Sequence, residues 1–94
     1  MADQLQPNDL EEGTRVELEW SPKGSPGTGK RAEGEVTRVW RPDGDVEQFT
    51  VQTDDFALNV YTDYRDPPVE RVEGDEDPDA ETVGRLDGIT RTGT

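Results

Sequence analysis

The sequence predicts an all-β protein, a small antiparallel barrel of five or six strands preceded by one short helical turn. Apolar residues alternate with polar ones along several short runs, which is the period of a strand with one buried face. No run of useful helical length accompanies them. Because a meander of short strands must close on itself or form two packed sheets to bury one face, we expect a barrel.

Residues 1–12 are expected to form a polar tail that ends in a single helical turn. The first six residues have few apolar anchors, so we expect a frayed end. In the turn, Asn8 or Asp9 can act as the cap and Gly13 can end the helical geometry. Leu10 is then its one contact with the core.

The barrel domain is expected over residues 13–90, with a tail at 91–94. Its first strand, residues 13–20, is the clearest one, because Val16, Leu18 and Trp20 alternate with charged residues. Residues 21–31 contain two prolines and three glycines, so we expect a flexible loop that is neither strand nor helix.

A β-hairpin at residues 33–53 is the organising element of the predicted barrel. Its first strand, residues 32–41, is expected to be long and bent, because Gly34 lies inside it and its apolar residues change parity. Pro42 and Gly44 suit the turn, since proline presets φ and glycine accepts a positive φ. The third strand then runs to the acidic pair at 54–55.

Three further segments complete the predicted fold. Leu58, Val60 and Thr62 alternate with their neighbours and indicate a fourth strand. A brief edge strand is expected at residues 69–73, and the acidic segment 73–82 is expected to be a flexible, solvated loop. A last strand follows, with bends at its glycines; its apolar residues are Val83, Leu86 and Ile89.

The charge balance indicates a salt-rich environment. Of the 94 residues, 23 are acidic and 10 are basic, which gives a net charge of −13, and only 28% are hydrophobic. Such a surface repels itself at low ionic strength, whereas about 1 M salt shortens the Debye length to roughly 3 Å. We therefore attribute the acidity to life at high salt rather than to a specific cationic partner.

The residue types that are missing exclude most catalytic templates. The chain has no cysteine and no histidine, so disulfides, thiolate metal sites and the usual general base are excluded. No basic start followed by an apolar run opens the sequence, and no stretch of eighteen apolar residues occurs. We expect a cytoplasmic, soluble, non-enzymatic protein without cofactor, metal or membrane contact, and we favour a monomer.

Two segments are similar to ligand-binding loops but lack required positions. Residues 24–30 satisfy G-x-x-x-x-G-K, yet Arg31 replaces the Ser or Thr of the phosphate-binding loop and a strand follows. Residues 75–81 resemble the start of a calcium loop, but Ala80 and Leu86 stand where Gly and Glu are needed. We expect no nucleotide ligand and a solvated acidic loop.

The chain resembles the Src-homology-3 type of small barrel, including the translation- and transcription-associated KOW domains. The resemblance covers residues 13–89 and is carried by Gly13-Thr14-Arg15-Val16, a long loop, and Gly34-Glu35-Val36. It implies a small closed barrel and carries over no binding residue. The composition also looks like that of small uncharacterised acidic proteins of halophilic archaea.

Positive charge is concentrated in one part of this acidic chain. Five of the ten basic residues lie between residues 21 and 41, where only two acidic residues oppose them. Next to Trp40, such residues can contact phosphates while the ring stacks on a base, so we predict a single-stranded nucleic-acid site at Lys30, Arg31, Arg38, Trp40 and Arg41. The alternative is that Trp20 and Trp40 are core residues and the arginines pair with carboxylates.

A second candidate site combines two aromatic residues and an arginine at the end of the fourth strand: Tyr61, Tyr64 and Arg65. Tyr61 is out of phase with the core face, so an exposed ring there can anchor a protein partner, or it can pack under the acidic loop. The sequence thus predicts a binding or accessory module with a nucleic-acid or a protein ligand. A small carboxylate-based enzyme or a purely structural subunit of a complex is the competing hypothesis.

Overall fold

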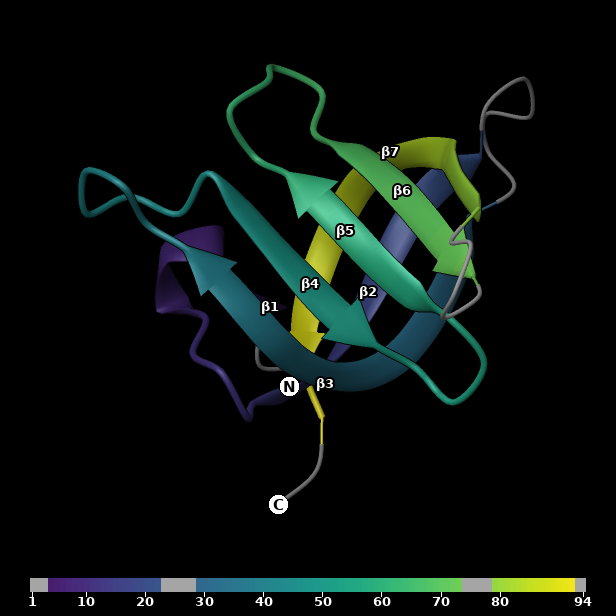
Figure 1. The fold of residues 1–94 in the computed structure, drawn as a ribbon, viewed down its shortest axis with the longest axis horizontal. Helices are drawn as coiled ribbons and strands as arrows, with labels where there is room; N and C mark the ends of the chain where they lie inside the picture. The colour runs from purple at the N-terminus through teal and green to yellow at the C-terminus, as the bar shows by residue number, and fades with distance from the viewer. Residues whose placement is uncertain (1–3, 23–28, 74–78, 93–94) are drawn as a thin grey trace.

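Six antiparallel strands close into a barrel in the computed structural model, which describes residues 4–22, 29–73 and 79–92 (Figure 1). Each strand pairs with the next one along the chain, and the last pairs back with the first. A short seventh strand and one 3₁₀ turn complete the described elements. Their bounds are β1 Gln4–Leu5, η1 Pro7–Asp9, β2 Arg15–Pro22, β3 Lys30–Trp40, β4 Gln48–Gln52, β5 Ala57–Tyr61, β6 Pro68–Glu73 and β7 Asp79–Arg91. The predicted all-β barrel is confirmed, and it is consistent with the Src-homology-3 type.

Two long strands change partners and so close the barrel. The first half of β3 pairs with β2 and its second half with β4, with a register shift between Val36 and Arg38. The first half of β7 pairs with β6 and the second half with β2. Figure 1 shows β3 curving around one side of the barrel, which confirms the predicted long, bent strand.

Glycine is required where these bent strands meet their neighbours. A Cβ atom added at Gly34 would overlap the carbonyl oxygen of Gln52, and one at Gly84 would overlap the carbonyl oxygen of Ser21. Gly44, in the hairpin turn, has the positive φ expected from the sequence, at 97°.

The core is formed by inward-facing residues of the barrel strands together with two residues from outside the strands. Among the described residues no polar or charged side chain is buried. The buried apolar set is Leu10, Val16, Leu18, Trp20, Val36, Val46, Phe49, Val51, Leu58, Val60, Val69 and Ile89. Leu10 thus makes the core contact predicted for it.

The N-terminal segment is more ordered than predicted. Gln4 and Leu5 form β1 and pair with Thr90 and Ile89 of β7, so the expectation of a frayed end over the first six residues is wrong for these two. Residues 1–3 lie outside the described part of the chain. The pairing of β7 with β6 ends at Arg85. The backbone groups on that edge of β7 are therefore available to β1 at Ile89 and Thr90, because an unpaired strand edge readily accepts another strand.

The helical turn is shorter than predicted and has a different cap. It spans only Pro7–Asp9, and Gln6 rather than Asn8 or Asp9 occupies the N-cap position. The Asp9 carboxylate accepts a hydrogen bond from the Gln6 backbone N–H at 3.0 Å. The Asn8 side chain therefore does not cap the turn and instead binds Asp45 and Val46.

Two predicted loops and one predicted tail are partly strand. Ser21 and Pro22 continue β2, and Lys30 and Arg31 begin β3, so the loop prediction for residues 21–31 is wrong at both ends. Likewise residues 79–82 of the predicted acidic loop belong to β7, and so does Arg91 of the predicted tail. Residues 23–28 and 74–78, which include most of the phosphate-loop and calcium-loop look-alikes, lie outside the described residues.

The predicted edge strand is an interior strand. β6 pairs with β5 on one side and with β7 on the other, and Pro68 is its first residue. Pairing with β7 starts at Asp79, before the apolar alternation of the last strand begins, because backbone hydrogen bonds need no apolar pattern.

We predict that Gly34→Ala destabilises the barrel by roughly 1–3 kcal/mol, because β3 or β4 must shift to accommodate the new methyl group. Gly88→Ala is the matched control inside a strand, since its Cβ would lie 3.8 Å from the Gln4 side chain, an ordinary contact. Its effect should stay below about 1 kcal/mol. Urea unfolding measures both; equal stability of the two variants would contradict the close approach at Gly34.

We also predict that the midpoint of thermal unfolding rises by roughly 10 °C or more between salt-free buffer and molar KCl, because salt screens carboxylate repulsion that acts on a small core. Replacing the exposed Asp54 and Asp55 by lysine should reduce this dependence. Circular dichroism follows the transition. An identical midpoint in both buffers would show that repulsion does not limit stability.

Candidate functional site

The structure brings Trp40 of the first candidate site and Tyr61 of the second onto one outer face of the barrel. Trp40 of β3 lies opposite Gln48 of β4, and Gln48 lies opposite Tyr61 of β5. Directly opposed residues share a face of the sheet with Cβ atoms about 4.5–5.5 Å apart. Trp40, predicted as a nucleic-acid contact, and Tyr61, predicted as a protein contact, therefore belong to one row of side chains.

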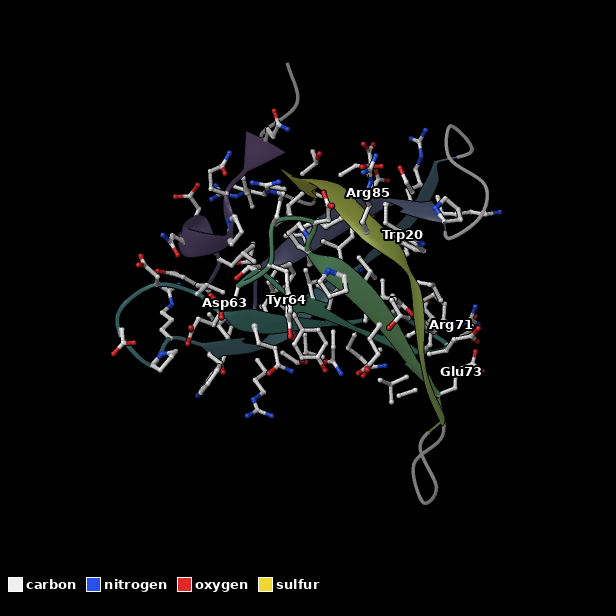
Figure 2. All side chains as sticks on the ribbon, turned by 90° about the horizontal axis from the view of Figure 1, so that it is seen from above. Trp20, Asp63, Tyr64, Arg71, Glu73 and Arg85 are labelled. Atoms are coloured by element: carbon white, nitrogen blue, oxygen red, sulfur yellow. The ribbon has the colours of Figure 1, made fainter. Side chains whose placement is uncertain are left out.

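This row forms part of a depression with a volume of about 250 Å³. Trp40 is 48% exposed and Tyr64 is 63% exposed, and these two are the exposed large apolar side chains of the described chain. Figure 2 shows Asp63 and Tyr64 side by side, beyond the end of β5 and far from Arg71 and Glu73. The described residues lining the depression are Trp40, Glu47, Gln48, Tyr61, Asp63 and Tyr64.

The outward position of Trp40 follows from the register shift in β3. Val36 is buried opposite Val51, whereas Arg38 and Trp40 are exposed, although all three have the same parity in the sequence. The extra residue at the shift turns the rest of β3 over, as a β-bulge does. The alternative that both tryptophans are core residues is thus correct for Trp20, which is 8% exposed, and wrong for Trp40.

A hydrogen-bond network on the sheet holds Tyr61 in place. Its hydroxyl donates to Oε1 of Glu70 at 3.0 Å, and the Asn59 amide donates to the same oxygen at 3.3 Å. Thr50 in turn donates to Asn59 Oδ1 at 2.6 Å. Burial raises the pKa of Tyr61, and the hydrogen bond to Glu70 and the charge of Glu70 raise it further. Tyr61 therefore presents a neutral, oriented ring to the depression.

The two segments that carry the carboxylates of the depression are bonded to each other. The Glu47 backbone N–H donates to the Trp40 carbonyl at 3.0 Å, and the Thr62 N–H donates to the Glu47 carbonyl at 2.9 Å. The Thr62 hydroxyl also donates to the Val46 carbonyl. Glu47, before β4, and Asp63, after β5, are thus held on connected backbone.

Hydrogen bonds from the N-terminal segment also hold the loop between β3 and β4. The Arg41 guanidinium donates to the Leu10 carbonyl. Asn8 accepts a hydrogen bond from the Val46 N–H at 2.8 Å and donates one to Asp45 Oδ1 at 3.1 Å. With Val46 buried, the loop is anchored, and the Arg41 guanidinium is used to hold the fold.

The basic residues predicted as a nucleic-acid site do not form one group. Lys30 and Arg31 begin β3 at its far end, opposite β2, where Arg31 approaches Glu17 at 3.9 Å. Arg38 alone lies on the same face as Trp40, one row away and opposite Thr50. Arg65 is exposed and follows Tyr64 in the chain.

Sequence reasoning missed three residues of the depression. Glu47 precedes β4 and Gln48 is its first residue. Neither has a distinguishing pattern in the sequence, and their place beside Trp40 depends on strand pairing. Asp63 has one local signal, its position between Tyr61 and Tyr64. Its role as a carboxylate beside aromatic rings appears only in the folded chain.

Two features are not found within residues 4–22, 29–73 and 79–92. No helix there is long and apolar enough to cross a membrane. The same residues contain no group of three or more His, Cys, Asp or Glu side chains placed to hold a metal ion.

We predict that Tyr61 ionises above its ordinary pKa of about 10. The unfolded tyrosine loses its proton first, so the folded state gains stability from Tyr61 below about pH 10 and loses it as the pH rises further. The ultraviolet titration curve of tyrosinate in the wild type minus the curve of Tyr61→Phe gives the ionisation of Tyr61 alone. The Tyr64→Phe variant should retain the raised pKa of Tyr61. A difference midpoint at or below the ordinary value would contradict the bond to Glu70.

No family model, curated protein or solved structure matches this chain, so its function is inferred from the geometry of the depression.

Proposed function

We propose that this protein is a non-enzymatic binding module that docks a protein partner on the depression between β3, β4 and the segment after β5. One observation carries the proposal: the exposed Trp40 and Tyr64 flank the oriented ring of Tyr61 on an otherwise acidic barrel. Aromatic side chains that give large contact area at low entropic cost are typical anchors of protein interfaces.

The charges of the depression favour a protein over a nucleic acid. Glu47 and Asp63 line it, and carboxylates at that position repel phosphates. Of the predicted basic set, only Arg38 lies near the rings on the same face, so phosphate contacts would be few. Molar salt also removes most of the free energy that counterion release supplies to nucleic-acid binding.

The acidic surface is consistent with a protein that acts at high salt. A net charge of −13 and a core without buried charge among the described residues suit a cytoplasm of high salt, where a small barrel of the Src-homology-3 or KOW type folds and remains dispersed. In such a medium the contact area of aromatic rings matters more for docking than long-range attraction.

We predict that Trp40→Ala combined with Tyr64→Ala weakens partner capture from native cell extract in molar KCl at least about tenfold, the effect of losing an interface hot spot. Arg31→Ala, an exposed change at the far end of β3, is the matched control and should leave capture unchanged. Circular dichroism should show the wild-type fold for each variant, because the replaced side chains are exposed.

Full capture by the Trp40 and Tyr64 double variant would contradict the proposed function. Titration with a single-stranded oligonucleotide in the same buffer distinguishes the other ligand class. Tight binding that depends on Trp40 and Arg38 would replace the protein partner by nucleic acid.

A further inference from the structure

We propose, resting on the proposed function, that the depression accepts one arginine side chain of the partner, stacked on its aromatic rings and paired with Glu47 and Asp63. The lining supplies both interactions that a guanidinium needs. Three rings provide π faces and two carboxylates provide acceptors, and none of the described lining residues is basic.

The size of the depression favours a single side chain. Its volume of about 250 Å³ is less than the roughly 300 Å³ at which small-molecule sites begin. It is also open to the surface, since the Trp40 and Tyr64 side chains on its rim are 48% and 63% exposed. A side chain projecting from a docked protein fits such a site better than an enclosed metabolite.

The same barrel forms this arrangement with its own arginine at the other end of β5. The Arg71 Cζ atom lies 4.2 Å from the centroid of the Phe56 ring, and the Arg71 guanidinium forms an ion pair with Glu73 (Figure 2). The depression has the corresponding rings and carboxylates, whereas no arginine lines it in the described part of the chain. A partner's arginine completes the set.

Arginine suits the site better than lysine. Its planar guanidinium is weakly hydrated, stacks on aromatic faces and bonds carboxylates through two parallel N–H groups. The lysine ammonium is compact and strongly hydrated, so it loses more hydration on entering among rings. Because Glu47 and Asp63 come from two different segments, a forked donor is also better placed to reach both.

The charged residues around the depression do not prevent it from binding an arginine. Arg41 donates to the Leu10 carbonyl, and Glu70 accepts from Tyr61. Arg38, one row from Trp40, and Arg65, after Tyr64, oppose a cation, but neither lines the depression. At molar salt, charges separated by much more than about 3 Å are screened. The affinity for a guanidinium therefore depends on its direct contacts with Glu47 and Asp63 and on its stacking on the rings.

The test is a nuclear magnetic resonance titration in molar KCl with three blocked pentapeptides of glycine and serine that carry a central arginine, lysine or citrulline. Citrulline has nearly the shape of arginine without its charge. The indole N–H of exposed Trp40 reports binding, and that of buried Trp20 is the internal reference. We expect the arginine peptide to move the Trp40 resonance, with binding at least about fivefold tighter than that of the citrulline peptide.

Variants separate the contributions to this binding. Glu47→Gln with Asp63→Asn keeps the shape of the lining and should weaken binding of the arginine peptide about fivefold, as expected for ion pairs that solvent still reaches. Trp40→Ala should abolish binding of the peptide. Because this variant lacks the Trp40 reporter, the resonances of Tyr61 and Tyr64 are used to detect any remaining binding. Arg31→Ala should change nothing.

The outcomes also separate this inference from the proposed function. If the citrulline peptide binds as well as the arginine peptide, or the arginine peptide does not shift Trp40 at its solubility limit, the arginine site is refuted. The proposed function still stands in that case if partner capture requires Trp40 and Tyr64. If capture is independent of both rings, the docking surface itself fails.

Discussion

The structure depends on the change of partner in the middle of β3. The register shift between Val36 and Arg38 allows the strand to leave β2 and join β4, and Gly34 allows the backbone of Gln52 to approach closely. The same shift keeps Val36 in the core and turns Trp40 to the solvent. One local irregularity therefore helps to close the barrel and also creates the exposed ring on which the candidate site is built.

The stability of this barrel comes from apolar packing rather than from ion pairs. No charged side chain is buried among the described residues, and each ion pair between them has at least one exposed side chain, as Arg15 with Glu33 illustrates. Exposed pairs contribute little free energy, and salt weakens them further. A small core inside a carboxylate-rich surface explains why salt should stabilise the fold and why a ligand should rely on ring contacts.

The candidate site is positioned by elements distant in sequence. Tyr61 is oriented by Glu70 of β6, while the loop before β4 is held by Asn8 and by the Leu10 carbonyl at the N-terminal turn. These bonds order the backbone around the depression before any ligand arrives, which lowers the entropy lost on binding. Substitutions in the N-terminal turn should therefore change the geometry of the depression, although no residue of the turn lines it.

Local pattern alone determined the all-β class, most strands, the turn at Gly44 and the core role of Leu10, because alternation and turn chemistry are properties of neighbouring residues. Strand pairing decided the rest. The β1 pairing with β7, the interior place of β6 and the outward side of Trp40 depend on register between distant segments, which no local period contains. For the same reason, the sequence placed Trp40 and Tyr61 in separate sites, and only the pairing of both with Gln48 joined them.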